Sequence, residues 1–377
     1  MKEYSNIISY VFIVGAAQGI LLSIFLLKKK ENQTANRLLG ILMIIFAIDL
    51  LNGAAYLTGL IKYFPWTMAL SNTFPYLYGP MVFLYVKILT EGDNKFRFNY
   101  AFHFIPFVLT QIYGLLYFYF EGAEYQLSIL DFNTPAPWHI KLIGDIIPIH
   151  GITYVVLTII ESYRYNRKIK QSFSNLAKIN LAWVRLFIIG TVAVWFIVIV
   201  AYMLNFIFGE ELQANILIYI SMTILLYSLG VKSLQQPQVS FELLELNNDK
   251  KTPQYKKSGL NEKVAEKIIS SVNNLMEEEK LYLNSQLSLS ELSEKVGVST
   301  HNLSEVINTK LGKNFYDFVN SFRIEEVIKM LKDKKYLNYS LLGIGYEAGF
   351  SSKSAFYSSF KKITGSTPTQ YRKSISS

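Results

Sequence analysis

Long apolar runs separated by short polar segments dominate the first 232 residues. A helix needs about 20 mostly apolar residues to cross the hydrocarbon core of a bilayer. Seven runs of about that length appear, bounded by charges or by proline and glycine clusters: Ser5–Leu27, Arg37–Leu60, Thr67–Leu89, Tyr100–Phe120, Lys141–Tyr163, Trp183–Phe208 and Leu212–Val231. The pattern predicts an all-α protein whose residues 1–232 form a bundle of seven transmembrane helices.

Lysine and arginine are unequally distributed among the loops between these runs. The first, third and fifth loops hold twelve of them, whereas the amino terminus and the even loops hold three. Cytoplasmic loops carry the excess of basic residues. We therefore expect a multi-pass protein of the cell inner membrane, with its amino terminus outside and its carboxyl terminus in the cytoplasm. The first run is too long for a cleaved signal peptide and ends at Lys28, so we expect it to be retained.

The composition indicates one part of the chain in lipid and one in water, and it excludes several kinds of binding and catalytic site. The first 236 residues carry 29 charged side chains, whereas the last 141 carry 36. The absence of cysteine excludes disulfides and thiolate zinc sites, and four scattered histidines make a metal cluster improbable. Walker, zinc-protease and Gly-x-Ser-x-Gly motifs are all missing from the sequence. We expect neither an enzyme nor a bound cofactor or metal.

Ionisable and amide side chains within the spans suggest a pocket that opens outward. The candidates for lining it are Asp49, Asp145, Asn205 and Asn215, because polar groups within a bilayer are costly and often functional. Interhelical hydrogen bonds that only hold the bundle together are the commoner explanation, so the signal ligand stays unknown. Gly15 and Gly19 have the spacing of a helix-dimer face. Ordinary close packing explains such a pair as well as a homodimer does.

A hydrophilic linker, residues 233–260, leads into a helical region, residues 261–377. The stretch Leu289–Ile307 has apolar residues at helical spacing, the small Ser293 and a central Gly297. Gly297 can adopt the left-handed turn conformation, and Ser299 can cap a second helix. This pattern predicts a helix-turn-helix.

A second copy of the pattern follows around Gly349, with an apolar helix at Phe315–Leu331 between the two copies. That helix would be about 25 Å long at 1.5 Å per residue. Two recognition helices joined by such a rod could enter successive major grooves on one face of a duplex, about 34 Å apart. The spacing thus predicts one chain that reads a bipartite site in double-stranded DNA.

Residues 262–373 resemble the DNA-binding domain of the AraC family of transcription regulators. The segment Gly349–Arg372 is similar to the carboxyl-terminal signature of that family, and Arg323 on the connecting helix fits as well. The signature positions are Phe360, Lys361, Gly365, Pro368, Tyr371 and Arg372. Gly345 and Ser293 depart from the family pattern, in which both positions are usually alanine. Glycine at position 345 should weaken its helix by about 1 kcal/mol. The seven-span region resembles a membrane-bound subgroup of the family by architecture alone.

The resemblance implies which side chains face the bases. In the first motif they would be His301, Ser304 and Glu305, and in the second Lys353, Ser354, Tyr357 and Ser358. Glu305 stands where related proteins often carry an arginine. A carboxylate can accept a hydrogen bond from cytosine N4 but repels phosphates. The first helix-turn-helix would therefore recognise a different base or contribute little to DNA binding. His301 could also be merely an exposed helix residue.

Charge is uneven along the carboxyl-terminal region. Residues 237–309 have a net charge of -3, whereas residues 310–377 have a net charge of +7. The phosphate contacts should therefore lie mostly in the second part. The candidates are Lys310, Lys313, Lys361, Lys362 and Arg372. We assign Lys332, Lys334 and Lys335 to a solvated face.

These patterns together predict a membrane-embedded transcription regulator that is controlled by a signal sensed in its membrane domain. The partners it implies are double-stranded DNA, the lipid bilayer, an unknown signal ligand and, through the Gly15 face, a second copy of the chain. The alternative is a membrane receptor or transporter whose helical tail is a protein-interaction module.

Overall fold

The computed structural model describes residues 2–92, 94–130, 137–176, 182–208, 214–235 and 261–376. Every regular element of these residues is a helix, apart from an isolated antiparallel bridge between Phe173 and Ser288. The chain divides into two compact units. The first unit comprises Met1–Tyr163 and Leu181–Gln238, and the second comprises Arg164–Asn180 and Val239–Ser377.

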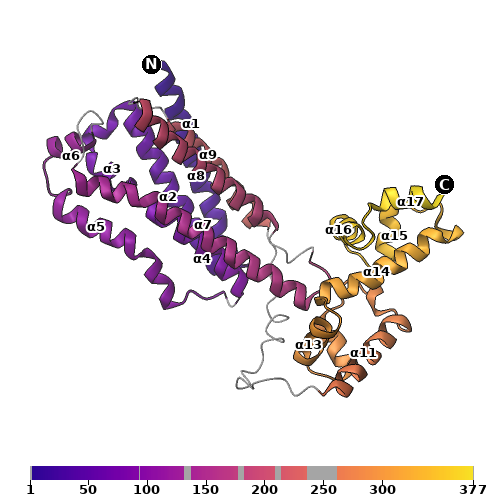
Figure 1. Ribbon diagram of the computed structural model, residues 1–377. Helices are drawn as coiled ribbons and strands as arrows, with labels where there is room; N and C mark the ends of the chain where they lie inside the picture. Colours follow the sequence, from indigo (N-terminus) through magenta and orange to yellow (C-terminus); the bar gives the residue numbers. More distant parts are fainter. Residues whose placement is uncertain are drawn as a thin grey trace. The chain divides into compact units, whose positions relative to one another are not determined.

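Long helices form the first unit (Figure 1). They are α1 (Lys2–Lys28), α2 (Gln33–Thr58), α4 (Pro75–Glu91), the part of α7 (Trp138–Ser172) that precedes Arg164, α8 (Ala182–Phe208) and α9 (Ala214–Gln235). Helix α1 packs against α2 and α9, α2 also packs against α4, and α8 packs against α9. Shorter helices complete the unit: η1 (Leu60–Tyr63), α3 (Pro65–Ser71), η2 (Phe98–Phe104), α5 (Ile105–Tyr117) and α6 (Ala123–Leu130).

Three helices among the described residues are long and apolar enough to cross a membrane, compared with the seven runs in the sequence. They are Ile7–Lys28, Gln33–Thr58 and Trp138–Ser172. The predicted run Thr67–Leu89 is divided between α3 and α4, because Pro75 has no amide hydrogen to continue the ladder of α3. The predicted run Tyr100–Phe120 is divided between η2 and α5, which has only 13 residues. In α8 the described side chains give a shorter apolar stretch, Ile188–Ile197.

The second unit contains two small helical lobes that share one long helix (Figure 1). The first lobe has α11 (Glu262–Glu277), η3 (Leu281–Leu283), α12 (Leu289–Val296) and α13 (Thr300–Lys310). The shared helix is α14 (Phe315–Lys332). The second lobe has η4 (Lys334–Tyr336), α15 (Leu341–Glu347), α16 (Lys353–Thr364) and α17 (Pro368–Ser376).

Helix α14 contributes to two separate hydrophobic cores. Phe315, Phe318 and Val319 belong to the core of the first lobe. Ile324, Val327, Met330 and Leu331 belong to the core of the second lobe. The change from one core to the other falls at Arg323, so this residue lies where the lobes meet.

The predicted boundaries of the domains differ in two respects from these units. Residues 233–235, predicted to begin the linker, are the end of α9; the rest of the linker, residues 236–260, lies outside the described residues. The segment Arg164–Asn180, predicted to lie within the membrane domain, belongs to the second unit. No local sequence pattern indicates that assignment.

Candidate nucleic-acid interface

The first helix-turn-helix is held by side-chain caps and one glycine. Ser288 accepts a hydrogen bond from the amide of Glu291 at the start of α12, and Ser299 accepts one from Asn302 at the start of α13. Between the helices, Gly297 adopts a φ of 73°, in the left-handed region that glycine tolerates. These local features confirm the predicted turn and fix the angle at which α13 leaves it.

The exposed face of α13 carries the three predicted base contacts of the first motif. The side chain of His301 is 82% exposed, and its Nε2 lies 3.7 Å from Oε2 of Glu305. Ser304 Oγ accepts from Nδ2 of Asn308 at 3.2 Å. Asn308, which is not among the predicted base contacts, is exposed on the same face and carries both a donor and an acceptor.

The second helix-turn-helix repeats this construction. Ser340 caps α15 through the amide of Gly343, and Ser352 caps α16 through the amide of Ala355. Gly349 has a φ of 92° in the turn. A Cβ on Gly349 would clash with the carbonyl oxygen of Tyr282 and lie 2.9 Å from Cα of Leu283. Only glycine therefore allows this turn to approach η3 of the first lobe.

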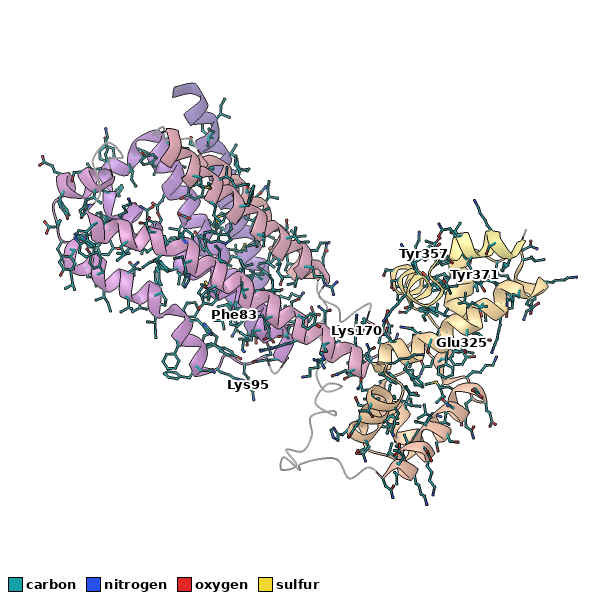
Figure 2. All side chains as sticks on the ribbon, viewed as in Figure 1. Phe83, Lys95, Lys170, Glu325, Tyr357 and Tyr371 are labelled. Carbon is teal, nitrogen blue, oxygen red and sulfur yellow. The ribbon has the colours of Figure 1, made fainter. Side chains whose placement is uncertain are left out.

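Helix α16 presents its predicted base contacts from its first two turns. Nζ of Lys353 lies 5.5 Å from the ring centroid of Tyr357, a cation-π distance. Tyr357 (Figure 2) is half-buried. Its ring packs edge-on against that of Phe356, with the ring centroids 5.3 Å apart. Ser354 and Ser358 are exposed beside them. The Tyr357 ring thus contacts the ammonium group of Lys353, and part of the ring stays accessible.

The predicted phosphate contacts fall into two groups. Lys361 is exposed at the end of α16. The four others already contact protein atoms. Lys310 forms an ion pair with Glu262, and Lys362 forms one with Asp317 at 2.7 Å. Lys313 donates a hydrogen bond to Ser321 Oγ at 3.1 Å, and Arg372 donates to the carbonyl oxygens of Tyr339, at 2.8 Å, and Leu337. Hydrogen bonding and the charge of Lys310 lower the pKa of Glu262. Binding a phosphate at Lys310 or Lys362 would compete with these exposed pairs.

A buried arginine holds the two lobes together. Arg323 is 1% exposed. It donates from Nε to the Tyr282 carbonyl at 2.7 Å and from Nη2 to the Asn284 carbonyl at 2.9 Å. Its guanidinium also lies 5.7 Å from the ring centroid of Phe350 in the second lobe. One side chain of α14 therefore contacts the turn of one lobe and η3 of the other.

Ser174 supplies further acceptors for the same guanidinium. Arg323 Nη1 donates to the Ser174 carbonyl, and Nη2 donates to its Oγ, both at 3.2 Å. Ser174 Oγ in turn donates to the carbonyl of Leu287 at 2.5 Å. Ser174 lies 149 residues before Arg323. The segment that follows α7 is thus built into the second unit.

A second tie between the lobes is formed by Glu326. Its carboxylate accepts from Nζ of Lys280 and from the hydroxyl of Tyr282, each at 3.1 Å. Burial, and then the neighbouring charge of Glu326, raise the pKa of the Tyr282 phenol. Together with Arg323 and Gly349, this tie fixes how α13 and α16 are presented relative to each other.

The predicted pocket residues lie in the first unit and are only partly described. Asp49 is buried on α2 and lines a cavity. Asp145 is exposed on α7 and does not line that cavity. The helical neighbours Gly144 and Ile147 face it instead. The side chains of Asn205 and Asn215 lie outside the described residues. Among the described residues, histidines and acids form no group that could hold a metal ion.

Comparison with known proteins places the similarity in the second unit. Residues 292–374 match a family described as a helix-turn-helix domain. An HTH-type transcriptional regulator of Staphylococcus aureus (strain COL) is 41% identical over 101 residues, which cover 27% of this chain and 13% of the relative. The melibiose operon regulatory protein of Escherichia coli (strain K12) is 31% identical over 87 residues, 23% of this chain and 28% of that protein.

The chain thus spans less than a third of the length of either relative, and no solved structure matches it. The similarity is to transcriptional regulators rather than to enzymes. It confirms an AraC-type helix-turn-helix region at the carboxyl terminus. Residues 292–374 of this chain therefore contain a helix-turn-helix domain of the kind found in these regulators.

Proposed function

We propose that this chain is a membrane-embedded transcription regulator that reads a bipartite operator in double-stranded DNA. The observation that carries the proposal is the pair of capped recognition helices, α13 and α16, on lobes that share α14. At 18 residues, α14 is about 27 Å long. That length is comparable to the distance between successive major grooves, about 34 Å.

Selection of bound duplexes tests this function directly. We would select fragments of the source genome with the full chain in lipid nanodiscs, at several salt concentrations, and then measure binding to the best sites. Lys353→Ala should weaken binding about tenfold, because a base or phosphate contact of a cation is worth about 1 to 3 kcal/mol. Lys334→Ala, on the solvated face of η4, is the matched control.

A tail that binds only protein would give a different result. Neither substitution would then change DNA binding, and no duplex would be preferred over another. In that case the alternative function, a receptor or transporter with a protein-interaction module, would replace the proposal.

The membrane location is the second part of the proposal. Three apolar helices of sufficient length support it. Large apolar side chains on α1 also remain exposed, as expected for contact with lipid, among them Tyr10, Val14, Leu21 and Phe25. We propose an outside amino terminus and a cytoplasmic carboxyl terminus from the distribution of basic residues among the loops.

Because the chain has no cysteine, single substitutions can map the topology cleanly. Lys62→Cys and Gly122→Cys should react with an impermeant thiol reagent in intact cells. Asn94→Cys should react only after the cells are opened. Reaction of Asn94→Cys in intact cells, or protection of Lys62→Cys, would contradict the orientation.

Control by a sensed signal is the third part. The linker joins the two units in sequence, and the segment Arg164–Asn180, which begins within α7, belongs to the second unit. Ser174 of this segment binds Arg323. We propose that both connections carry the state of the membrane domain to the operator reader. A rigid helical insertion in the linker, with and without Ser174→Ala, should change reporter expression in cells; unchanged expression in both variants would contradict this control.

A further inference from the structure

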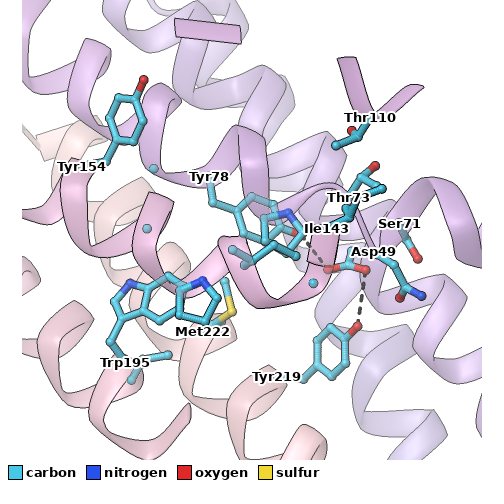
Figure 3. A pocket seen from close by; sticks show the side chains of 18 of the residues that line it. Asp49, Ser71, Thr73, Tyr78, Thr110, Ile143, Tyr154, Trp195, Tyr219 and Met222 are labelled. Atoms are coloured by element: carbon cyan, nitrogen blue, oxygen red, sulfur yellow. Dashed lines mark hydrogen bonds between the residues drawn. The ribbon is translucent and has the colours of Figure 1, made fainter. Parts of the chain in front are cut away.

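A cavity of about 500 Å³ lies within the first unit. Its walls come from α2, α4, α7, α8 and α9, with α3 and α5 closing part of it. Most of the lining side chains are apolar or aromatic, and Figure 3 shows several of them. The volume is in the range of sites that bind small organic molecules, about 300 to 1,000 Å³.

A buried carboxylate forms part of the wall. Asp49 is 4% exposed. Its Oδ2 accepts from the hydroxyl of Tyr78 at 2.5 Å, and its Oδ1 accepts from the hydroxyl of Tyr219 at 3.4 Å (Figure 3). Both oxygens of this side chain therefore act as acceptors.

This carboxylate lacks a cation in the described part of the chain. Its hydrogen-bond partners are the hydroxyl groups of Tyr78, Tyr219 and Ser71. No described lysine, arginine or histidine lies within 4.0 Å of it. A buried carboxylate without a counter-charge is expensive. Since the carboxylate lines a cavity, a ligand can supply the missing positive charge.

The cavity has one polar side and one apolar side. Ser71 and Thr73 lie on the side of Asp49, whereas Trp195 and Met222 lie across the cavity from them (Figure 3). Thr73 Oγ1 already accepts from Nε2 of Gln111 at 2.6 Å. A complementary ligand therefore has a small polar head and a larger apolar or aromatic body.

We propose that this cavity binds a hydrophobic amine, with its protonated nitrogen at Asp49 and its apolar body against Trp195 and Met222. The inference deepens the proposed function by naming the ligand class of the membrane domain. Its test measures ligand binding without DNA. A failure here would therefore leave the DNA-reading function standing, and a failure of DNA binding would leave this site standing.

Two probes that share an apolar body but have a charged or a neutral head group test the proposal. The full chain in nanodiscs would be titrated with 4-phenylbutylamine and with 4-phenylbutan-1-ol, its neutral counterpart. Tryptophan fluorescence and isothermal calorimetry would follow saturation, with empty nanodiscs correcting for partition into lipid. The amine should bind saturably and about tenfold or more tightly than the alcohol, because a hydrogen bond to a charged group is worth about that factor.

Substitutions locate the site. Asp49→Asn should remove the preference for the amine, whereas Asp145→Asn, an exposed carboxylate on α7 outside the cavity, should retain it. Gly144→Leu is the second variant, because a Cβ at Gly144 meets nothing within 4 Å and the residue lines the cavity. It should fold normally, fill the space and weaken amine binding at least tenfold.

Several results would overturn the proposal. They are equal affinity for amine and alcohol, no saturable amine binding, the same loss in Asp145→Asn as in Asp49→Asn, and undiminished binding in Gly144→Leu. If sodium or potassium ions alone abolish the tighter binding of the amine, the carboxylate binds a metal cation instead. If Asp49→Asn does not fold, Gly144→Leu and the pair of probes still decide the question.

Discussion

At the scale of single residues, the second unit is organised around a buried cation, Arg323, that pairs with no carboxylate among the described residues. The described acceptors of Arg323 are two backbone carbonyls near η3, Ser174 and the side-chain oxygen of Asn320. A planar guanidinium with five donors can satisfy acceptors in several directions at once. The resemblance of Arg323 to a family position was visible in the sequence, but its partners were not, because Ser174 is far away along the chain.

Arg323→Lys should destabilise this unit. Lysine keeps the charge, but its three donors lie on one nitrogen, so it cannot reproduce the hydrogen bonds that Nε, Nη1 and Nη2 of Arg323 make in different directions. We expect the free energy of unfolding to fall by about 3 kcal/mol, as measured by chemical denaturation. Lys329→Arg, exposed on the same helix, should change it by less than about 0.5 kcal/mol. Equal stability of the two variants would remove Arg323 from this role.

Tyr282 makes the stability of the same unit depend on alkaline pH. Burial and Glu326 raise the pKa of its phenol in the folded state above the unfolded value of about 10. Above about pH 10 the unfolded chain therefore releases this proton first, and the free energy of unfolding should fall as pH rises. Below that pH the contribution is fully present.

Unfolding of wild type and Tyr282→Phe at increasing pH measures the effect. The variant should be less stable near neutral pH, by about 1 kcal/mol for the lost hydrogen bond, and should show a smaller alkaline decline. Tyr339→Phe, an exposed tyrosine, is the control. An identical decline in all three proteins would mean that Tyr282 titrates normally.

At the scale of elements, the sequence predicted the helices of the second unit better than those of the first unit. Serines that cap α13 and α16 and glycines that end α12 and α15 gave boundaries within a residue or two, because caps act through the nearest amides. In the first unit, apolarity alone could not show that Pro75 divides one predicted run. Nor could it show which side chains line the cavity, since that depends on packing between distant helices.

Gly345 shows where a local propensity rule was insufficient. Helix propensity predicts that alanine would strengthen α15, but a Cβ at this position would lie 2.9 Å from the ring of Phe356. The glycine therefore allows α15 and α16 to cross closely, and its cost to the helix is offset by that packing.

Two of the positive-φ glycines, Gly349 and Gly312, give a matched pair of substitutions. Gly312→Ala should cost about 1 kcal/mol, because alanine is disfavoured at positive φ but a Cβ there meets nothing within 4 Å. Gly349→Ala should cost at least about 2 kcal/mol more, since the Cβ also meets the backbone of Tyr282 and Leu283. Thermal denaturation compares them; similar midpoints for the two variants would show that η3 and the turn can separate.

At the scale of the whole molecule, one claim joins the proposals: two recognition helices on lobes that share α14 read two half-sites together. The ties of Arg323, Glu326 and Gly349 hold the lobes in one arrangement. A fixed arrangement permits only one spacing and one face of the duplex. Independent lobes would tolerate many spacings.

The affinity of the full chain in nanodiscs for its selected operator, measured by fluorescence anisotropy at fixed salt, tests this claim most directly. The operator would be compared with a version carrying about five extra base pairs, half a helical turn, between the half-sites. We predict that the insertion weakens binding by about a hundredfold or more, because only one helix can then reach its groove. Equal affinity for the two duplexes would contradict the bipartite reader.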